Sequence, residues 1–138
     1  MLHKILLPVD MTDRHAPALA LAADMAGTGG EVVLLHVIEV IAGLSVEEEK
    51  PFYQRLEKAA QAHLERLGGE LLARKVSSRA VIRFGNRVAE VARFAVEDST
   101  ELIVLTAPRF APNEPAAGLA SLSHQVGLFS PCHVLLVK

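Results

Sequence analysis

The 138-residue chain has little of several residue types that mark common protein classes. Its single cysteine, Cys132, excludes an internal disulfide framework and a zinc site built from cysteines, which fits a reducing compartment. Tryptophan is absent and tyrosine occurs once, so an aromatic platform for single-stranded nucleic acid is not expected. No apolar run approaches the roughly 18 residues that span a bilayer. The sequence predicts a cytoplasmic protein without membrane insertion.

The charge balance is also close to neutral. The formal net charge is -2 and the pI is about 6.3, so the chain exerts no long-range attraction on nucleic acid or anionic lipid. Half of the residues, 51%, are hydrophobic, which is enough to build a core. One domain covering residues 1–138 is therefore expected, and nucleic acid is not an expected partner.

Short apolar segments alternate with longer segments of helical periodicity along the whole chain. Strands are predicted where apolar and β-branched residues cluster, at residues 4–9, 32–40, 77–84, 102–105 and 133–137. Helices are predicted where apolar residues recur at helical spacing, at residues 16–26, 45–74, 88–96 and about 115–129. The order alternates strictly, with a strand at each end.

Capping residues and prolines indicate where the helices begin. Thr12 and Asp13 offer oxygens that favour a cap for the first helix, and Pro17 is tolerated only in its first turn. Ser45 and Glu48 have the spacing of a capping box, which predicts that the long helix begins there, with Pro51 as a candidate break.

Apolar stripes predict which helix faces pack on the sheet. In the long helix the stripe consists of Phe52, Leu56, Ala59, Ala60, Leu64, Leu67 and Leu71. In the next helix it consists of Val88, Val91, Ala92, Ala95 and Val96.

Strands that alternate with helices in this way are parallel, because each crossover returns the chain to the same edge of the sheet. The predicted fold is a doubly wound, Rossmann-like α/β sheet with helices on both faces. Such folds bind ligands at the carboxyl ends of their strands, where the strand order reverses. In this chain those ends are Asp10, Glu39, residues 84–85 and residues 106–109.

Five segments together resemble the universal stress protein family from end to end. They are KILLPVD followed by Thr12, VVLLHV, Gly85 after the third strand, ELIVL and SPCHVLLVK. The resemblance implies a five-stranded parallel sheet in the order 3-2-1-4-5. It also implies a homodimer through the last strand in many members, and ATP binding in some members.

The ATP-binding members carry a glycine signature after the fourth strand, and this chain departs from it. The signature is a glycine, two residues, a second glycine, nine residues and a third glycine followed by Ser or Thr. Thr106, Arg109 and Ala120 stand at the three glycine positions, and Ser121 stands at the hydroxyl position. Ten residues rather than nine separate Arg109 from Ala120.

The residue types in this loop argue against tight binding of a triphosphate. Glycines let main-chain amides approach phosphate oxygens, whereas Pro108, Pro112 and Pro115 each remove an amide donor. Glu114 adds a negative charge. Arg109 could compensate in part as a phosphate ligand, and the hydroxyl of Ser121 could still donate a hydrogen bond. The loop fits a stiffened cover or a different, smaller site.

Seven residues form the candidate nucleotide cleft, two of them through backbone groups. They are Val9, Asp10, Thr12, Val37, Thr106, Arg109 and Ser121. The resemblance implies that Asp10 contacts the adenine base, whereas its position equally fits a carboxylate that accepts hydrogen bonds from nearby loop amides. Thr12 fits a helix cap better than a ligand contact.

No catalytic or metal constellation is predicted. The six histidines match no metal motif, and His36, within an apolar strand, is expected to be a core or sheet-face histidine with a satisfied nitrogen. His124 is expected at the surface. Ser121, Ser123 and His124 are close in sequence, but adjacent helical residues point in different directions.

The last strand predicts the oligomeric state. By the family's strand order it is a sheet edge, and an exposed apolar edge favours pairing with another chain. A homodimer is expected through Val134, Leu135, Leu136 and Val137. The alternative is that the long helix or the proline-rich loop covers this edge within the monomer.

Two functions follow from these observations. The first is a non-enzymatic, homodimeric stress-response or regulatory protein that does not bind ATP tightly, needs no cofactor and acts on an unknown protein partner. The alternative is an adenine-nucleotide module that binds AMP, or ATP with magnesium, with at most slow ATPase activity.

Overall fold

The computed structural model describes residues 2–108 and 122–138. The strands are β1 (Lys4–Pro8), β2 (Glu31–Ile38), β3 (Ser77–Phe84), β4 (Leu102–Thr106) and β5 (His133–Val137). The helices are α1 (Ala16–Ala26), α2 (Lys50–Ala73), α3 (Arg87–Glu97) and α4 (Leu122–Phe129). Strands and helices alternate as predicted, although residues 115–121 of the predicted fourth helix lie outside the described residues.

The described strands form one parallel sheet in the order β3-β2-β1-β4-β5. In its centre β1 pairs with β2, with Leu7 opposite Leu34, and with β4, with Leu6 opposite Ile103. At one edge β5 pairs with β4, with Val104 opposite Leu135. The doubly wound fold class and its 3-2-1-4-5 order are confirmed.

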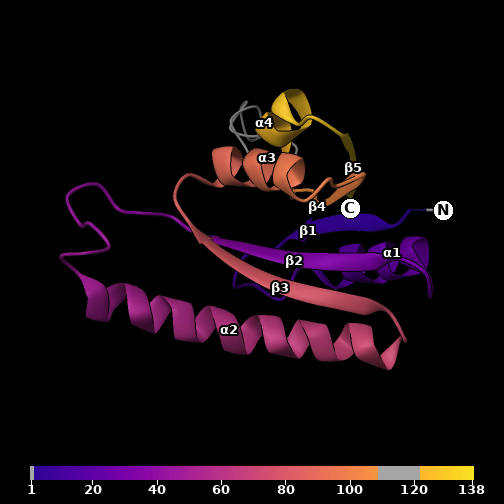
Figure 1. Ribbon diagram of the computed structural model, residues 1–138, viewed down its shortest axis with the longest axis horizontal. Helices are drawn as coiled ribbons and strands as arrows, with labels where there is room; N and C mark the ends of the chain where they lie inside the picture. Colours follow the sequence, from indigo (N-terminus) through magenta and orange to yellow (C-terminus); the bar gives the residue numbers. More distant parts are fainter. Residues whose placement is uncertain (1, 109–121) are drawn as a thin grey trace, which may run out of the picture.

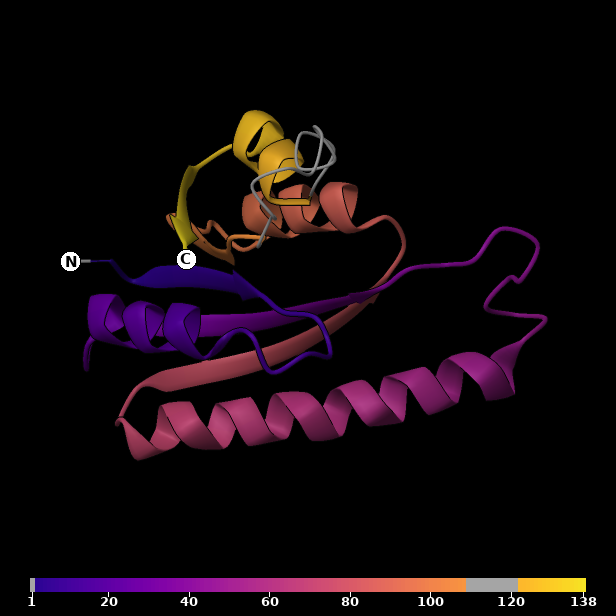
Figure 2. The same ribbon diagram turned by 180° about the vertical axis from the view of Figure 1, so that it is seen from behind.

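Helices cover both faces of the sheet, with α1 and α2 on one face and α3 and α4 on the other (Figures 1 and 2). Fully buried Leu7 and Leu34 pack with Leu19 of α1 and Leu71 of α2. On the opposite face, fully buried Ile103 belongs to the core that α3 and α4 cover. Burying both faces explains why the central strands read as almost continuous apolar runs.

The prediction that Thr12 or Asp13 caps α1 is wrong. The residue before the helix is His15, and it makes no side-chain capping bond. Thr12 instead donates hydrogen bonds from its amide, at 2.9 Å, and its hydroxyl, at 2.5 Å, to Oδ1 of Asp10. The ionised carboxylate of Asp10 makes stronger hydrogen bonds than a neutral acceptor would. These bonds hold Thr12 close to the end of β1, away from the first turn of α1. Pro17 does lie in the first turn, as predicted.

The α-helix α2 begins at Lys50, later than the capping-box pattern predicts. The Ser45 hydroxyl does accept the Glu48 amide, at 3.1 Å, but this bond closes a turn ahead of the helix. Pro51 then occupies the first turn, where its missing amide costs nothing, so it starts the helix instead of splitting it.

The predicted apolar stripes are confirmed in part: Ala60, Leu64, Leu67, Leu71, Val91 and Ala95 are buried, whereas Leu56, Ala59 and Val96 are exposed. Leu56 is exposed by 38%, whereas its neighbour Tyr53 is buried and donates its hydroxyl to the Leu44 carbonyl at 2.5 Å. In α3, Val96 is exposed while Phe94 is buried beneath the guanidinium of Arg83, 5.2 Å from the ring centroid. At both places a buried aromatic ring contributes to the packed face, Tyr53 with a hydrogen bond from its hydroxyl and Phe94 with a cation contact.

Across the described residues, none of the helices has both the length and the apolar character needed to cross a membrane.

Candidate functional site

A cleft opens at the carboxyl ends of β1, β2 and β4, where the strand order reverses. Its apolar wall includes Val9, Leu35, Val37, Val91 and Leu105. Its polar lining consists of Asp10, Arg14, His15, Arg87 and Thr106. Apolar walls with a few convergent polar groups are typical of small-molecule sites, and this edge of the sheet is where doubly wound folds bind them.

His15 connects the two sides of this cleft. It lies just before α1, is 5% exposed, and its Nε2 lies 2.8 Å from Oδ1 of Asp10 at the end of β1. Its Nδ1 lies 2.7 Å from Oγ1 of Thr106, the last residue of β4. The backbone nitrogen of Asp10 is also close, 3.1 Å from Nε2. One buried ring thus fixes the spacing between two strand ends.

The charges in this network can be assigned from the pKa shifts. Burial lowers the pKa of His15 below its ordinary value and outweighs the opposing effect of Asp10. Burial alone would raise the pKa of Asp10, but hydrogen bonds from Thr12 and His15 outweigh it and hold the pKa well below the usual range. At neutral pH the pair is a neutral imidazole beside a carboxylate.

The hydrogen-bond directions follow from these charges. Both the carboxylate and the backbone amide of Asp10 approach Nε2, at 2.8 and 3.1 Å. An ionised carboxylate only accepts and is the shorter contact, so the ring proton of His15 resides on Nε2 and is donated to Oδ1, and the amide is then not bonded to the ring. Nδ1 is then an acceptor and receives the hydroxyl proton of Thr106. The second carboxylate oxygen of Asp10, Oδ2, accepts a hydrogen bond from Nη2 of Arg14 at 2.9 Å.

The structure brings together four of the seven residues predicted for the cleft. Val9, Asp10, Val37 and Thr106 all line it. Thr12 does not line this cleft but binds the carboxylate of Asp10. Arg109 and Ser121 lie outside the described residues, as does the part of the predicted 106–118 loop from residue 109 on, which includes Pro112 and Pro115. Pro108 is described and does line the cleft.

His36 takes the role predicted for it. It is buried in β2, and its Nδ1 donates to the carbonyl of Val9 at 2.8 Å. This bond holds the backbone of Val9 just after β1. The Val9 amide donates to the Leu35 carbonyl at 2.9 Å, so both backbone groups of this residue are bonded to β2. The histidine is a satisfied sheet-face residue.

Three polar residues of the cleft were missed by sequence reasoning: Arg14, His15 and Arg87. The available signal was topological. A loop that follows the first strand of a doubly wound sheet folds back over the strand ends, so every polar residue between Asp10 and the first helix is a candidate. The sequence analysis instead interpreted Thr12 and Asp13 in this loop as caps of the first helix and did not consider their neighbours as cleft residues.

Within residues 2–108 and 122–138, no group of three or more His, Cys, Asp or Glu side chains is arranged to hold a metal ion. His63 is buried on α2, where a guanidinium nitrogen of Arg66 lies 2.6 Å from its Nδ1. The predicted surface position of His124 is confirmed. The Ser121, Ser123 and His124 group lies partly outside the described residues.

Fold and site define a class: a doubly wound α/β protein with a ligand cleft at the point where the strand order reverses. The chain belongs to the universal stress protein family, whose sequence profile matches residues 1–138. No curated protein matches the chain.

Solved structures agree with this assignment. Hypothetical protein MJ0577 is 28% identical over 100% of this chain and 96% of its own, with a TM-score of 0.85. A universal stress protein from Archaeoglobus fulgidus in complex with dAMP is 17% identical, covering 99% and 98%, with a TM-score of 0.74. A universal stress protein in complex with cAMP is 18% identical, covering 99% and 97%, with a TM-score of 0.72. The last two similarities show the shared fold.

Proposed function

We propose that this protein is a non-enzymatic regulatory member of its family whose cleft binds an adenosine nucleotide with one phosphate. The observation that carries the proposal is the cleft itself, where an apolar wall meets the convergent polar groups of Asp10, His15 and Thr106. Structural neighbours in complex with dAMP and cAMP support a mononucleotide as the ligand.

The composition of the segment after β4 supports one phosphate over three. Pro108 lines the cleft and, as a proline, has no main-chain amide to donate. Thr106, Arg109 and Ala120 stand where the ATP signature has its three glycines, and two further prolines follow Pro108 before Ala120. A triphosphate needs several amide donors and left-handed backbone positions, and these residue types supply few of them.

A binding role, without catalysis, fits the state of the buried histidine. A general base must offer a nitrogen to substrate. Both ring nitrogens of His15 are already engaged, one by the carboxylate of Asp10 and one by the hydroxyl of Thr106. In this proposal the ring holds the two strand ends in place, and the ligand binds in the cleft without undergoing a reaction.

The working assembly in this proposal is a homodimer through β5, with a further protein partner. β5 is an edge strand, and Leu136 is exposed by 48%. The preceding helix α4 exposes Leu128 by 65% and Phe129 by 69%. An apolar edge with unpaired backbone groups is stabilised when a second copy pairs with it.

Calorimetric titration with AMP tests the proposed ligand. We expect saturable binding of AMP to the wild type and an affinity several-fold lower in Asp10→Asn. In that variant an amide replaces the carboxylate at the cleft position that the family resemblance assigns to adenine contact. Asp24→Asn, an exposed change on α1, is the matched control and should bind like the wild type. No saturable heat with millimolar AMP, in protein of native helix content, would refute the proposed ligand.

A further inference from the structure

We propose that Arg14 and Arg87 together bind the phosphate of the nucleotide, taking over the task that main-chain amides of a glycine loop perform in an ATP site. This inference rests on the proposed function. Both side chains line the same cleft, and they come from different elements. A phosphate between them would be held from two sides.

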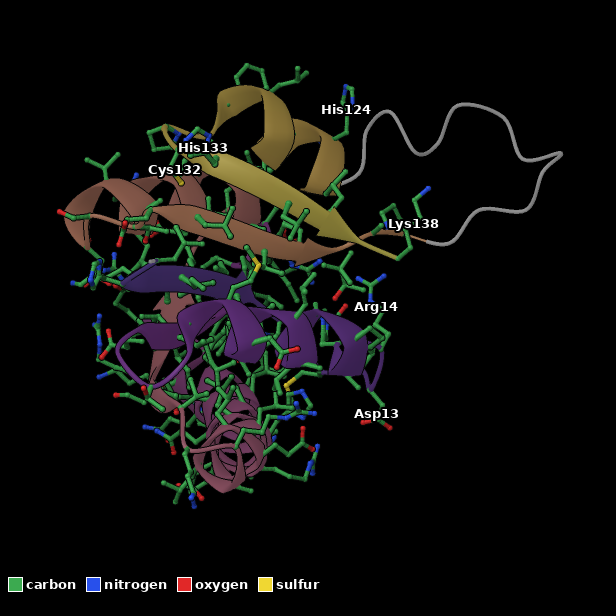
Figure 3. All side chains as sticks on the ribbon, turned by 90° about the vertical axis from the view of Figure 1, so that its right-hand side faces the viewer. Asp13, Arg14, His124, Cys132, His133 and Lys138 are labelled. Carbon is green, nitrogen blue, oxygen red and sulfur yellow. The ribbon has the colours of Figure 1, made fainter. Side chains whose placement is uncertain are left out.

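Arg14 approaches from the turn that follows β1. In Figure 3 its side chain lies at the start of α1, at the same end of the sheet as Lys138 after β5. Its Nη2 donates to Oδ2 of Asp10 at 2.9 Å, which fixes the guanidinium at the rim of the cleft. The side chain is still 46% exposed, and a guanidinium has five N–H donors, so one bond to Asp10 leaves donors for a second anion.

Arg87 approaches from the opposite side, as the first residue of α3. Its position is fixed by the neighbouring cap, in which the Asn86 side chain accepts the amide of Ala89 at 3.0 Å. The Arg87 Nε lies 3.7 Å from Oε1 of Glu39, which is too long for a hydrogen bond, and both side chains are about half exposed. Such a pair is weak and screened, so the guanidinium can turn toward a phosphate at little cost.

The charge balance of the cleft favours an anion. Among residues 2–108 and 122–138, the lining holds two arginines against one aspartate, and His15 is neutral at physiological pH because burial lowers its pKa. The carboxylate of Asp10 is already bonded to Thr12, His15 and Arg14. Arg87 has only its long, exposed contact with Glu39, at 3.7 Å, so a phosphate in the cleft would be a closer partner for its charge.

This arrangement also sets the preferred ligand. Two guanidinium groups supply enough hydrogen-bond donors for one phosphate, and arginine pairs with phosphate oxygens through two parallel hydrogen bonds. Further phosphates would require donors beyond this pair. The ligand class is therefore a nucleoside monophosphate or cyclic monophosphate, recognised by its phosphate as well as its base.

The test compares AMP with adenosine by calorimetric titration, in the wild type and in Arg14→Gln and Arg87→Gln. The AMP-to-adenosine affinity ratio should fall roughly tenfold in each variant, the effect of one charge-assisted hydrogen bond. Arg14→Lys and Arg87→Lys keep the positive charge but lose the planar guanidinium that can form two parallel hydrogen bonds. Their AMP-to-adenosine affinity ratios should lie between those of the glutamine variants and the wild type. The matched control is Arg74→Gln, an exposed change at the far end of α2, which should leave the ratio unchanged.

The outcomes separate the two proposals. If adenosine and AMP both bind and the ratio in the two glutamine variants equals that of the wild type, the arginine assignment is overturned while the nucleotide cleft stands. If the wild type binds neither ligand, the proposed function fails and this inference fails with it. Thermal unfolding of each variant shows whether a lost affinity reflects a lost fold.

Discussion

Nδ1 of His15 lies 2.7 Å from Oγ1 of Thr106, a residue 91 positions away along the chain. The contact joins the loop after β1 to the end of β4, the two strands between which the strand order reverses. The same ring is bonded through Nε2 to Asp10. The shape of the cleft therefore depends on one buried histidine.

Replacing Thr106 with valine should lower the free energy of unfolding by roughly 1–2 kcal/mol, because the buried Nδ1 of His15 loses its donor while side-chain volume hardly changes. Urea denaturation measures the loss. Thr106→Ser keeps the hydroxyl and is the control, expected to lie close to the wild type. Equal stability of the valine variant and the wild type would mean that this bond contributes nothing.

The low pKa of His15 predicts how stability depends on pH. Its ordinary value is 6.5 and burial lowers it in the folded protein, so as the pH falls below about 6.5 the unfolded chain takes up the proton first. The free energy of unfolding then decreases toward pH 5, by at most about 1.4 kcal/mol per pH unit for one proton. His15→Gln should show a shallower decrease in urea denaturation at pH 7, 6 and 5.

Parallel pH curves for the wild type and His15→Gln would contradict this assignment. The groups acting on the ring are Asp10, which raises its pKa, and Arg14 and His63, which lower it. Asp10 cannot produce the slope in this range, because its own pKa is depressed and its contribution is lost only below its ordinary value of 3.8. The comparison between the two proteins therefore isolates His15.

The edge strand gives a prediction about assembly. Leu135 and Val137 pack against the core on the α1 side, so charges there would damage the fold, whereas Leu136 is exposed by 48%. Leu136→Asp should convert a dimer into a monomer in light scattering, because the β5 edge would then carry two facing charges. Leu72→Asp, at a leucine exposed by 74% on α2, should leave the mass unchanged. A wild-type monomer, or a Leu136→Asp dimer, counts against the β5 interface.

The cap of α3 can be tested on its own. Asn86 accepts the amide of Ala89 at 3.0 Å, and Asn86→Ala should destabilise the protein by about 1 kcal/mol. Asn86→Asp preserves the acceptor and should remain near the wild type in thermal unfolding. If alanine and aspartate behave alike, the cap does not hold the helix start that carries Arg87.

Much of the fold could be predicted from the sequence. Strands that are buried on both faces, such as 32–40 and 102–105, are continuous apolar runs. Because these strands alternate strictly with helices, the sheet must be parallel. The strand order came from the family resemblance. Helix starts were less predictable: Thr12 resembles a cap, yet a carboxylate only two residues earlier is a better partner for its hydroxyl and amide.

The site was predictable only in part for a related reason. Asp10 and Thr106 end buried strands, so topology alone places them at the cleft. The role of His15 depends on a contact with Thr106 that spans most of the chain, and no local pattern encodes it. Arg87 opens α3 and looks like an ordinary solvated helix residue until the third strand and the cleft are placed in space.

The most direct test of the whole account is the ratio of the dissociation constants of ATP and AMP for the wild-type protein, measured by calorimetric titration in the presence of magnesium. A cleft that holds one phosphate through arginines, beside a segment poor in amide donors, predicts that AMP binds at least as tightly as ATP. Binding of ATP roughly tenfold or more tighter than AMP, about 1.4 kcal/mol, would contradict it.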